Sequence, residues 1–232
     1  MGPVLQMTSV SKRYGSKEAL EDITFKAEAG RIIGLLGSNG SGKTTLMKMA
    51  SGLLQPTAGE IRICGETVGT KSKAMTAFMP DQPLTEPWMK VRDAVSFFGD
   101  FFTDFDRTKA KEMLSFMGLQ DKDKISSLSK GMNERLQLTL TLSRNARLYL
   151  LDEPIGGVDP VAREKILDAI VQYYSENSCL IVSTHLVSDI ERIFDEVLFI
   201  KNGKLLLQED VDQIRMKHRK SVVDLFKEVY AE

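Results

Sequence analysis

The sequence predicts an α/β fold, with a mixed sheet, an antiparallel β edge and an inserted helical subdomain. Residues 4–10 and 19–27 alternate in hydrophobicity on either side of Gly15 and Ser16, as two antiparallel strands do. Residues 91–146 instead repeat their apolar positions with helical spacing. After them, strand-like and helix-like segments alternate, which favours parallel strands between helices.

The first half of the chain is rich in strands. Residues 32–36 form a continuous apolar run bounded by glycines, which is typical of a buried central strand. We expect a helix over residues 43–51, ending at Gly52, and short strands over 60–63 and 74–79. The buried strand therefore passes into a helix through a glycine-rich segment.

The second half completes the expected core. We expect strands over 148–151 and 180–183, helices over 161–174 and 186–194, and a hairpin of 197–200 with 204–207 that turns at Asn202-Gly203. This order predicts one domain over 1–232. Its catalytic core spans about 1–82 and 147–210, its helical subdomain about 83–146 and its C-terminal helical tail about 210–232.

Composition narrows the class of partner and the compartment. Lys plus Arg (31) balance Asp plus Glu (32), so we expect no nucleic-acid partner. Two separated cysteines, Cys64 and Cys179, favour a reducing cytosol. The N-terminus lacks a secretory signal pattern, and no apolar stretch approaches the roughly 20 residues of a membrane-spanning helix. At a membrane, a partner would have to supply the spanning helices.

A phosphate-loop pattern occupies the glycine-rich segment, between the buried strand and its helix. Glycines let successive backbone N–H groups surround phosphates, while a lysine supplies a cation and a threonine hydroxyl can bind Mg²⁺. The sequence thus predicts binding of a nucleoside triphosphate with Mg²⁺ by Gly37, Ser38, Asn39, Gly40, Ser41, Gly42, Lys43, Thr44 and the following Thr45. The alternative, an ordinary glycine-rich turn, leaves the Lys-Thr pair and both flanking elements unexplained.

Two carboxylates end the apolar run 148–151. In open α/β sheets the carboxyl ends of parallel strands border the ligand crevice. We expect Asp152 to hold Mg²⁺ or its water and Glu153 to polarise an attacking water. Solvated acids at a turn before Pro154 are the alternative.

The segment Leu128-Ser129-Lys130-Gly131-Met132 resembles the signature motif of the ABC-type ATPases. Ser129 can cap a helix that begins near Gly131, and the free N–H groups of that helix can face a γ-phosphate. The resemblance extends from residue 4 to about 207 and implies the ABC ATPase fold on a P-loop NTPase core. It also implies that the signature contacts ATP held by the opposite subunit of a homodimer or heterodimer.

The same resemblance assigns further roles. Tyr14 takes the place of an aromatic that stacks on adenine, with packing on its own subdomain as the alternative reading. Asp159 belongs to a loop that contacts the partner's site, and His185 matches a histidine that reaches the γ-phosphate. The family's Mg²⁺-sensing glutamine is assigned to Gln82, although alignment by the preceding proline would select Asp81.

Two departures from the family pattern stand in the signature, where Lys130 and Met132 replace a glycine and a glutamine. These residues are similar to those of bacterial ABC-2 type ATPases, mostly exporters whose permease is a separate chain. The resemblance therefore implies an ATP hydrolase that drives a separate membrane permease from the cytoplasmic face. A soluble iron–sulfur assembly ATPase with one cassette is the alternative, and co-purification with a membrane protein would separate the two.

The helical insertion and the C-terminal tail each carry a cluster of residues that could contact a partner. Phenylalanines crowd the helical insertion, where they can dock a permease helix or form the subdomain's own core: Phe97, Phe98, Phe101, Phe102, Phe105 and Phe116. A basic run near the C-terminus, residues 215–220, is interpreted as a solvated helix end or as a contact with anionic lipid.

Overall fold

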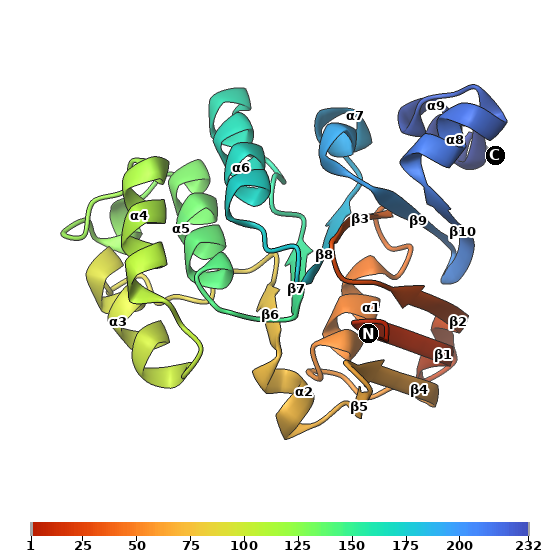
Figure 1. The fold of residues 1–232 in the computed structure, drawn as a ribbon, viewed down its shortest axis with the longest axis horizontal. Coiled ribbons are helices and arrows are strands. Elements are labelled where there is room, and N and C mark those ends of the chain that lie inside the picture. The colour runs from red at the N-terminus through yellow and green to blue at the C-terminus, as the bar shows by residue number, and fades with distance from the viewer. Residues whose placement is uncertain (1, 232) are drawn as a thin grey trace.

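Two sheets form the centre of the fold, described for residues 2–231 in a computed structural model (Figure 1). The smaller sheet is antiparallel, in the order β2 (Lys17–Ala27), β1 (Leu5–Tyr14), β4 (Ala58–Ile63) and β5 (Glu66–Thr67). The larger sheet has the order β10 (Lys204–Asp210), β9 (Glu196–Lys201), β3 (Arg31–Leu36), β8 (Cys179–Thr184), β7 (Leu148–Asp152) and β6 (Thr76–Met79). Its strands are parallel except β10, which is antiparallel to β9. The predicted mixed sheet with an antiparallel edge is confirmed.

The register of the large sheet decides where the site lies. Leu36 pairs with Thr184 across β3 and β8, and Asp152 pairs with Ser183 across β7 and β8. The carboxyl ends of these parallel strands therefore end at one edge. The segments that follow them, which begin at residues 37, 153 and 185, must start close together.

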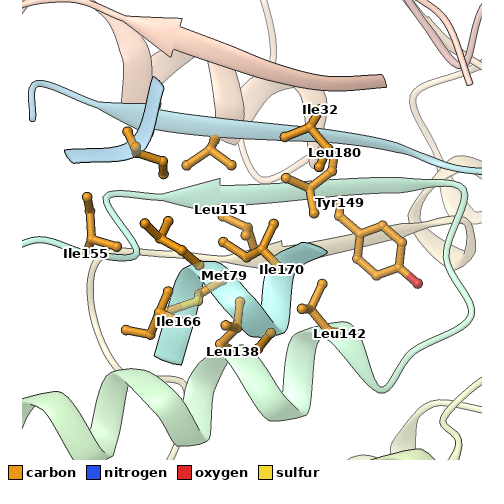
Figure 2. Packing of buried hydrophobic residues seen from close by; sticks show 14 of the residues in the cluster. Ile32, Met79, Leu138, Leu142, Tyr149, Leu151, Ile155, Ile166, Ile170 and Leu180 are labelled. Carbon is orange, nitrogen blue, oxygen red and sulfur yellow. The ribbon is translucent and has the colours of Figure 1, made fainter. Parts of the chain in front are cut away.

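Apolar packing fixes both faces of the large sheet. On one face, helix α1 (Lys43–Ala50) buries Leu46, Met47 and Met49 in a cluster that both sheets share. The other face packs on α5 (Lys130–Leu142) and α6 (Pro160–Tyr173). Figure 2 shows side chains of these two helices beneath strand residues, among them Leu138, Leu142, Ile166 and Ile170. Buried apolar strands with helices on both faces are what parallel sheets require.

The helical segment lies on the opposite side of the molecule from the C-terminal helices (Figure 1). It contains α3 (Val91–Phe101), α4 (Arg107–Met117), a 3-10 turn at Ile125–Ser127 and α5. The buried side chain of Arg144 joins it to the sheet, because its guanidinium donates to both Asp104 carboxylate oxygens and to the backbone oxygens of Ala74 and Thr76. Few groups other than arginine satisfy so many acceptors in one plane.

Two expected elements differ from the structure. The strand expected over 74–79 begins only at Thr76, because the short helix α2 (Thr70–Ala74) precedes it. The helix expected over 186–194 is a short α7 (Val187–Ile190) followed by a 3-10 turn, Glu191–Ile193. The chain must reach the sheet at Asp195, whose carboxylate accepts from the N–H of Ile32 at 2.8 Å. The helical residues therefore end just before this contact.

The C-terminal tail forms α8 (Val211–His218) and α9 (Val222–Tyr230). Much of its basic run is paired within the chain, since Arg215 contacts Asp212 and both Lys217 and His218 contact Glu209. This pairing favours the helix-end interpretation over lipid contact. Among the described residues, no helix combines the length and hydropathy needed to cross a membrane.

Candidate functional site

A cavity of about 560 Å³ opens at the edge where β3 and β7 end. Several residues predicted from the sequence line it: Tyr14, Asn39, Gly40, Gly42, Lys43, Thr44, Thr45 and Glu153. Gly37, Ser38 and Ser41 belong to the same loop behind this lining. Sequence reasoning missed five further residues of the lining: Lys17, Glu18, Ala19, Asn202 and Gly203. The sequence indicates a turn at Asn202-Gly203, but it does not indicate that this turn contacts the phosphate loop.

Glycines give the loop its path. Gly40 and Gly42 have φ values of +80° and +112°, where L-residues with a side chain are strained. A Cβ at Gly42 would lie 2.6 Å from the Leu20 side chain, and one at Gly37 would lie 2.5 Å from the backbone oxygen of Ile200. Only glycine allows the loop to turn this closely against its neighbours.

Lys43, the first residue of α1, folds back across the loop and is only 6% exposed. Its Nζ donates to the carbonyl oxygens of Gly37 at 2.8 Å and Ser38 at 3.2 Å, and lies 3.5 Å from Glu153 Oε1. This cation is poorly screened because it is buried. It can interact strongly with an anion in the cavity.

Asp152 ends β7 with a carboxylate that is nearly inaccessible, since the residue is 1% exposed. One oxygen accepts from the Ser183 hydroxyl, while Oδ2 is buried without a hydrogen-bond partner among the described residues. A buried, unpartnered carboxylate oxygen is costly unless a cation or water satisfies it. Thr44 lines the cavity, and Asp152 directly precedes Glu153 of the lining, so these oxygens would fit Mg²⁺, which takes few protein ligands beside water and phosphate.

Glu153 adopts an unusual backbone conformation, with φ of +52°. Its N–H donates to both the backbone oxygen and the hydroxyl of Ser183, each at 3.1 Å. Both carboxylate oxygens lie 3.0 Å from Nδ1 of His185, which follows β8. Strain of this kind persists only where surrounding contacts hold it, and it is common at functional sites. Glu153 lines the cavity, and His185 contacts it without being part of the lining.

Tyr14 ends β1 at the mouth of the cavity and is 50% exposed. Lys12 Nζ lies 5.3 Å from its ring centroid. The exposed ring leaves a face open for stacking, and this does not fit the alternative in which Tyr14 packs into its own subdomain.

The two candidates for the magnesium-sensing position differ in placement. Asp81 lines the cavity, whereas Gln82 is exposed and is not part of the lining. The same loop is tied to α5 through Gln137, whose Oε1 accepts from the N–H of Leu84 at 3.0 Å and whose Nε2 donates to Thr85 Oγ1 at 2.9 Å. Nothing in the sequence pattern around Gln137 indicated this connection.

The signature segment lies outside the cavity. The Ser129 hydroxyl caps α5 by accepting from the N–H of Met132, and Asp159 caps α6 by accepting from the N–H groups of Val161 and Ala162. These backbone N–H groups, that of Ala162 first, lower the pKa of Asp159. A Cβ at Gly131 would lie 3.0 Å from Ala162 and 3.5 Å from Asp159 Oδ2, so the two helix starts pack together.

Glu134, one turn into α5, has a raised pKa. Burial raises its pKa to about 7; Lys130 opposes this shift and Asp81 adds to it. The signature helix is therefore electrostatically coupled to the loop that carries Asp81.

A phosphate loop after the buried central strand β3, with an acidic pair at the end of β7 on the far side of β8, defines a P-loop nucleoside-triphosphate hydrolase. The family described as ABC transporter matches residues 20–156, more than half of the chain. The chain belongs to the ABC transporter family. It is an ATP-binding protein, and ATPases of this family couple hydrolysis to transport.

Individual relatives agree with this assignment. An ABC transporter ATP-binding protein of Bacillus subtilis (strain 168) is 30% identical over 227 residues, 96% of this chain and 76% of that protein. A Nod factor export ATP-binding protein I of Ralstonia nicotianae is 31% identical over 214 residues, 89% and 67% of the two chains. The solved structure of an ATP-binding subunit of an ABC transporter has the same fold, with a TM-score of 0.87 at 24% identity over 97% of this chain and 98% of that one. The iron–sulfur assembly alternative is not favoured.

Proposed function

We propose that this chain is the ATPase subunit of an export-type transporter, pairing head to tail with a second ABC ATPase and driving a separate membrane permease. One observation carries the proposal. The cavity contains the phosphate loop and Glu153, whereas Ser129 and Gly131 lie outside it at the starts of packed helices. A site that uses both sets must take them from two chains.

ATP binding is assigned to one side of the cavity. The loop N–H groups and Lys43 hold the phosphates, and the exposed ring of Tyr14 stacks on adenine. Gly37, Ser38, Asn39, Gly40, Ser41, Gly42, Thr44 and Thr45 form the rest of the cradle.

Hydrolysis is assigned to Glu153, which orients and polarises the attacking water, with His185 beside it to contact the γ-phosphate. The hydrogen bonds that the Glu153 N–H donates to the backbone oxygen and the hydroxyl of Ser183 support this role by fixing the backbone of Glu153. Thr44 and Asp152 would hold Mg²⁺; the family resemblance assigns its sensing residue to Gln82, although Asp81 is the one of the two that lines the cavity. The ion, when bound, neutralises charge on the β- and γ-phosphates.

In the proposed dimer, Ser129 and Gly131 bind the γ-phosphate of ATP on the partner, and the Asp159 loop contacts that partner site. The partner is a second copy of this chain or a paralogue. Support comes from α5, whose first N–H groups beyond the Ser129 cap offer an anion site.

The permease is expected to dock on an apolar groove of about 490 Å³ beside α3. The aromatic cluster divides in two there. Phe98 is buried in the core of the helical segment, whereas Phe97 and Phe101 stack on the outside with ring centroids 5.9 Å apart. The outer rings, together with Leu53, leave apolar surface for a partner helix. This attachment would hold the chain at the cytoplasmic face of the membrane.

Complementation tests the shared site directly. Lys43→Ala removes the phosphate cation of one chain, and Ser129→Arg blocks the signature of the other. Neither variant alone should hydrolyse ATP, but an equimolar mixture should regain activity, because one of the two sites in a mixed dimer combines an intact Lys43 with an intact Ser129. A mixture as inactive as its components would refute the head-to-tail arrangement.

A further inference from the structure

The C-terminal helix α9 returns to the entry of the phosphate loop. The hydroxyl of Tyr230, its last residue, donates to the backbone oxygen of Ile200 at 2.6 Å and has the backbone oxygen of Leu36 as a second acceptor at 3.2 Å. Leu36 ends β3 and directly precedes Gly37. A group near the end of the sequence therefore contacts the backbone where the loop begins.

Aromatic packing fixes the direction of this hydroxyl. The Tyr230 ring stacks on Phe226 with centroids 4.2 Å apart, and Phe226 meets Phe199 edge-on. Lys201 Nζ donates to the backbone oxygen of Val229 at 2.9 Å. Burial raises the pKa of Tyr230, so the phenol keeps its proton and acts as a donor.

Both acceptors are connected to the phosphate loop. The backbone oxygen of Ile200 lies so close to Gly37 that a Cβ there would approach it to 2.5 Å. Three residues later, the N–H of Gly203 donates to the backbone oxygen of Ser41 at 3.0 Å. The carbonyl oxygen of Gly37 in turn accepts from Lys43 Nζ. A shift of the β9–β10 turn would therefore move the backbone of the phosphate loop at Gly37 and Ser41.

We propose that Tyr230 is a positioning residue for ATP binding, which holds the phosphate loop in place through the backbone carbonyls of Leu36 and Ile200. The proposal rests on the assignment of that loop to the phosphates of ATP. It gives the C-terminal tail a role in the nucleotide site, although no residue of α9 lines the cavity.

Tyr230→Phe tests this role, because it removes the hydroxyl and keeps the ring. Tyr174→Phe is the matched control: its hydroxyl also donates to a backbone oxygen, that of Ser178 at 2.8 Å, but before the first residue of β8, at the other end of the sheet. Titration calorimetry with Mg²⁺ and ATP, steady-state hydrolysis and amide hydrogen exchange of residues 37–44 are compared in the full chain.

We expect Tyr230→Phe to weaken ATP binding and raise KM by about three- to tenfold, the range of one lost hydrogen bond, with kcat unchanged. Amide hydrogen exchange in the loop should accelerate. Tyr174→Phe should match the wild type in ATP affinity and in loop exchange, even if it lowers the unfolding temperature. Equal ATP affinity and equal loop exchange in the two variants would overturn the proposal.

Exchange is measured without nucleotide, so it also separates two kinds of failure. If the wild type bound no ATP, the assigned function would fall, and the exchange comparison would still decide the role of Tyr230. If the wild type binds ATP and Tyr230→Phe changes neither affinity nor exchange, only the role of Tyr230 falls.

Discussion

Lys43→Ala should reduce ATP affinity by about 30-fold. A buried ammonium about 4 Å from one phosphate charge contributes about 4 kcal/mol at an effective dielectric constant near 20. To make that contact, Lys43 exchanges its hydrogen bonds to the carbonyls of Gly37 and Ser38, each with a net value of about 1 kcal/mol. The remaining 2 kcal/mol, roughly, corresponds to a 30-fold change in dissociation constant.

Titration calorimetry with ATP and Mg²⁺ measures this effect. Lys48→Ala is the control, since Lys48 belongs to the same helix and carries the same charge but is exposed and does not line the cavity. It should bind ATP like the wild type. If Lys43→Ala bound ATP within twofold of wild type, or if both variants lost the same affinity, the assigned role of the lysine would be refuted.

Two further predictions concern the groove and the signature helix. Phe101 is 68% exposed on the groove, and Phe101→Glu should abolish co-purification with the permease while leaving ATP affinity intact. The control Val171→Glu, at a side chain 57% exposed on α6, should affect neither. Co-purification of Phe101→Glu at the wild-type level would rule out this surface. Because burial raises the pKa of Glu134 to about 7, the native state holds a proton there that the unfolded state has lost between pH 4.5 and 7. The wild type therefore loses folding stability as the pH rises through this window, whereas Glu134→Gln, which is always neutral, does not. At pH 8 the free energy of unfolding of Glu134→Gln should exceed that of the wild type by about 1 kcal/mol after allowance for solvent screening. Urea unfolding measures this difference, and Glu112→Gln, at an exposed position, is the control. A pH-independent difference between Glu134→Gln and wild type would contradict this assignment.

Much of the site was predictable because one rule determines it. Parallel strands end at a common edge, so the segments after β3, β7 and β8 had to meet once those strands were identified as buried. The loop 37–44, Glu153 and His185 begin these segments, and Asp152 is the last residue of β7. Their arrangement also depends on the strand order, which the structure gives.

The remaining contacts depend on tertiary geometry that has no local signal. Tyr230 contacts Leu36, which is 194 residues away in the sequence. Arg144 joins Asp104 to the backbone of Thr76, but in the sequence alone it cannot be told from an ordinary surface arginine. Gln137 sits at a helical position that periodicity would assign to the core, and its two hydrogen bonds to the loop at 84–85 appear only in the fold. The helix expected over 186–194 occupies almost these residues, but its second half is a 3-10 helix, a difference that hydrophobic periodicity does not indicate.

The mass of Glu153→Gln in solution tests the central claim, that ATP joins two ABC ATPases through sites they share. Slow hydrolysis should let ATP with Mg²⁺ accumulate at the interface, and binding at a shared site favours the dimer by mass action. Light scattering is applied to the variant, and to its mixture with any ABC ATPase that co-purifies with it. The account predicts the mass of a dimer with ATP and of a monomer with ADP; the same mass with both nucleotides would contradict it.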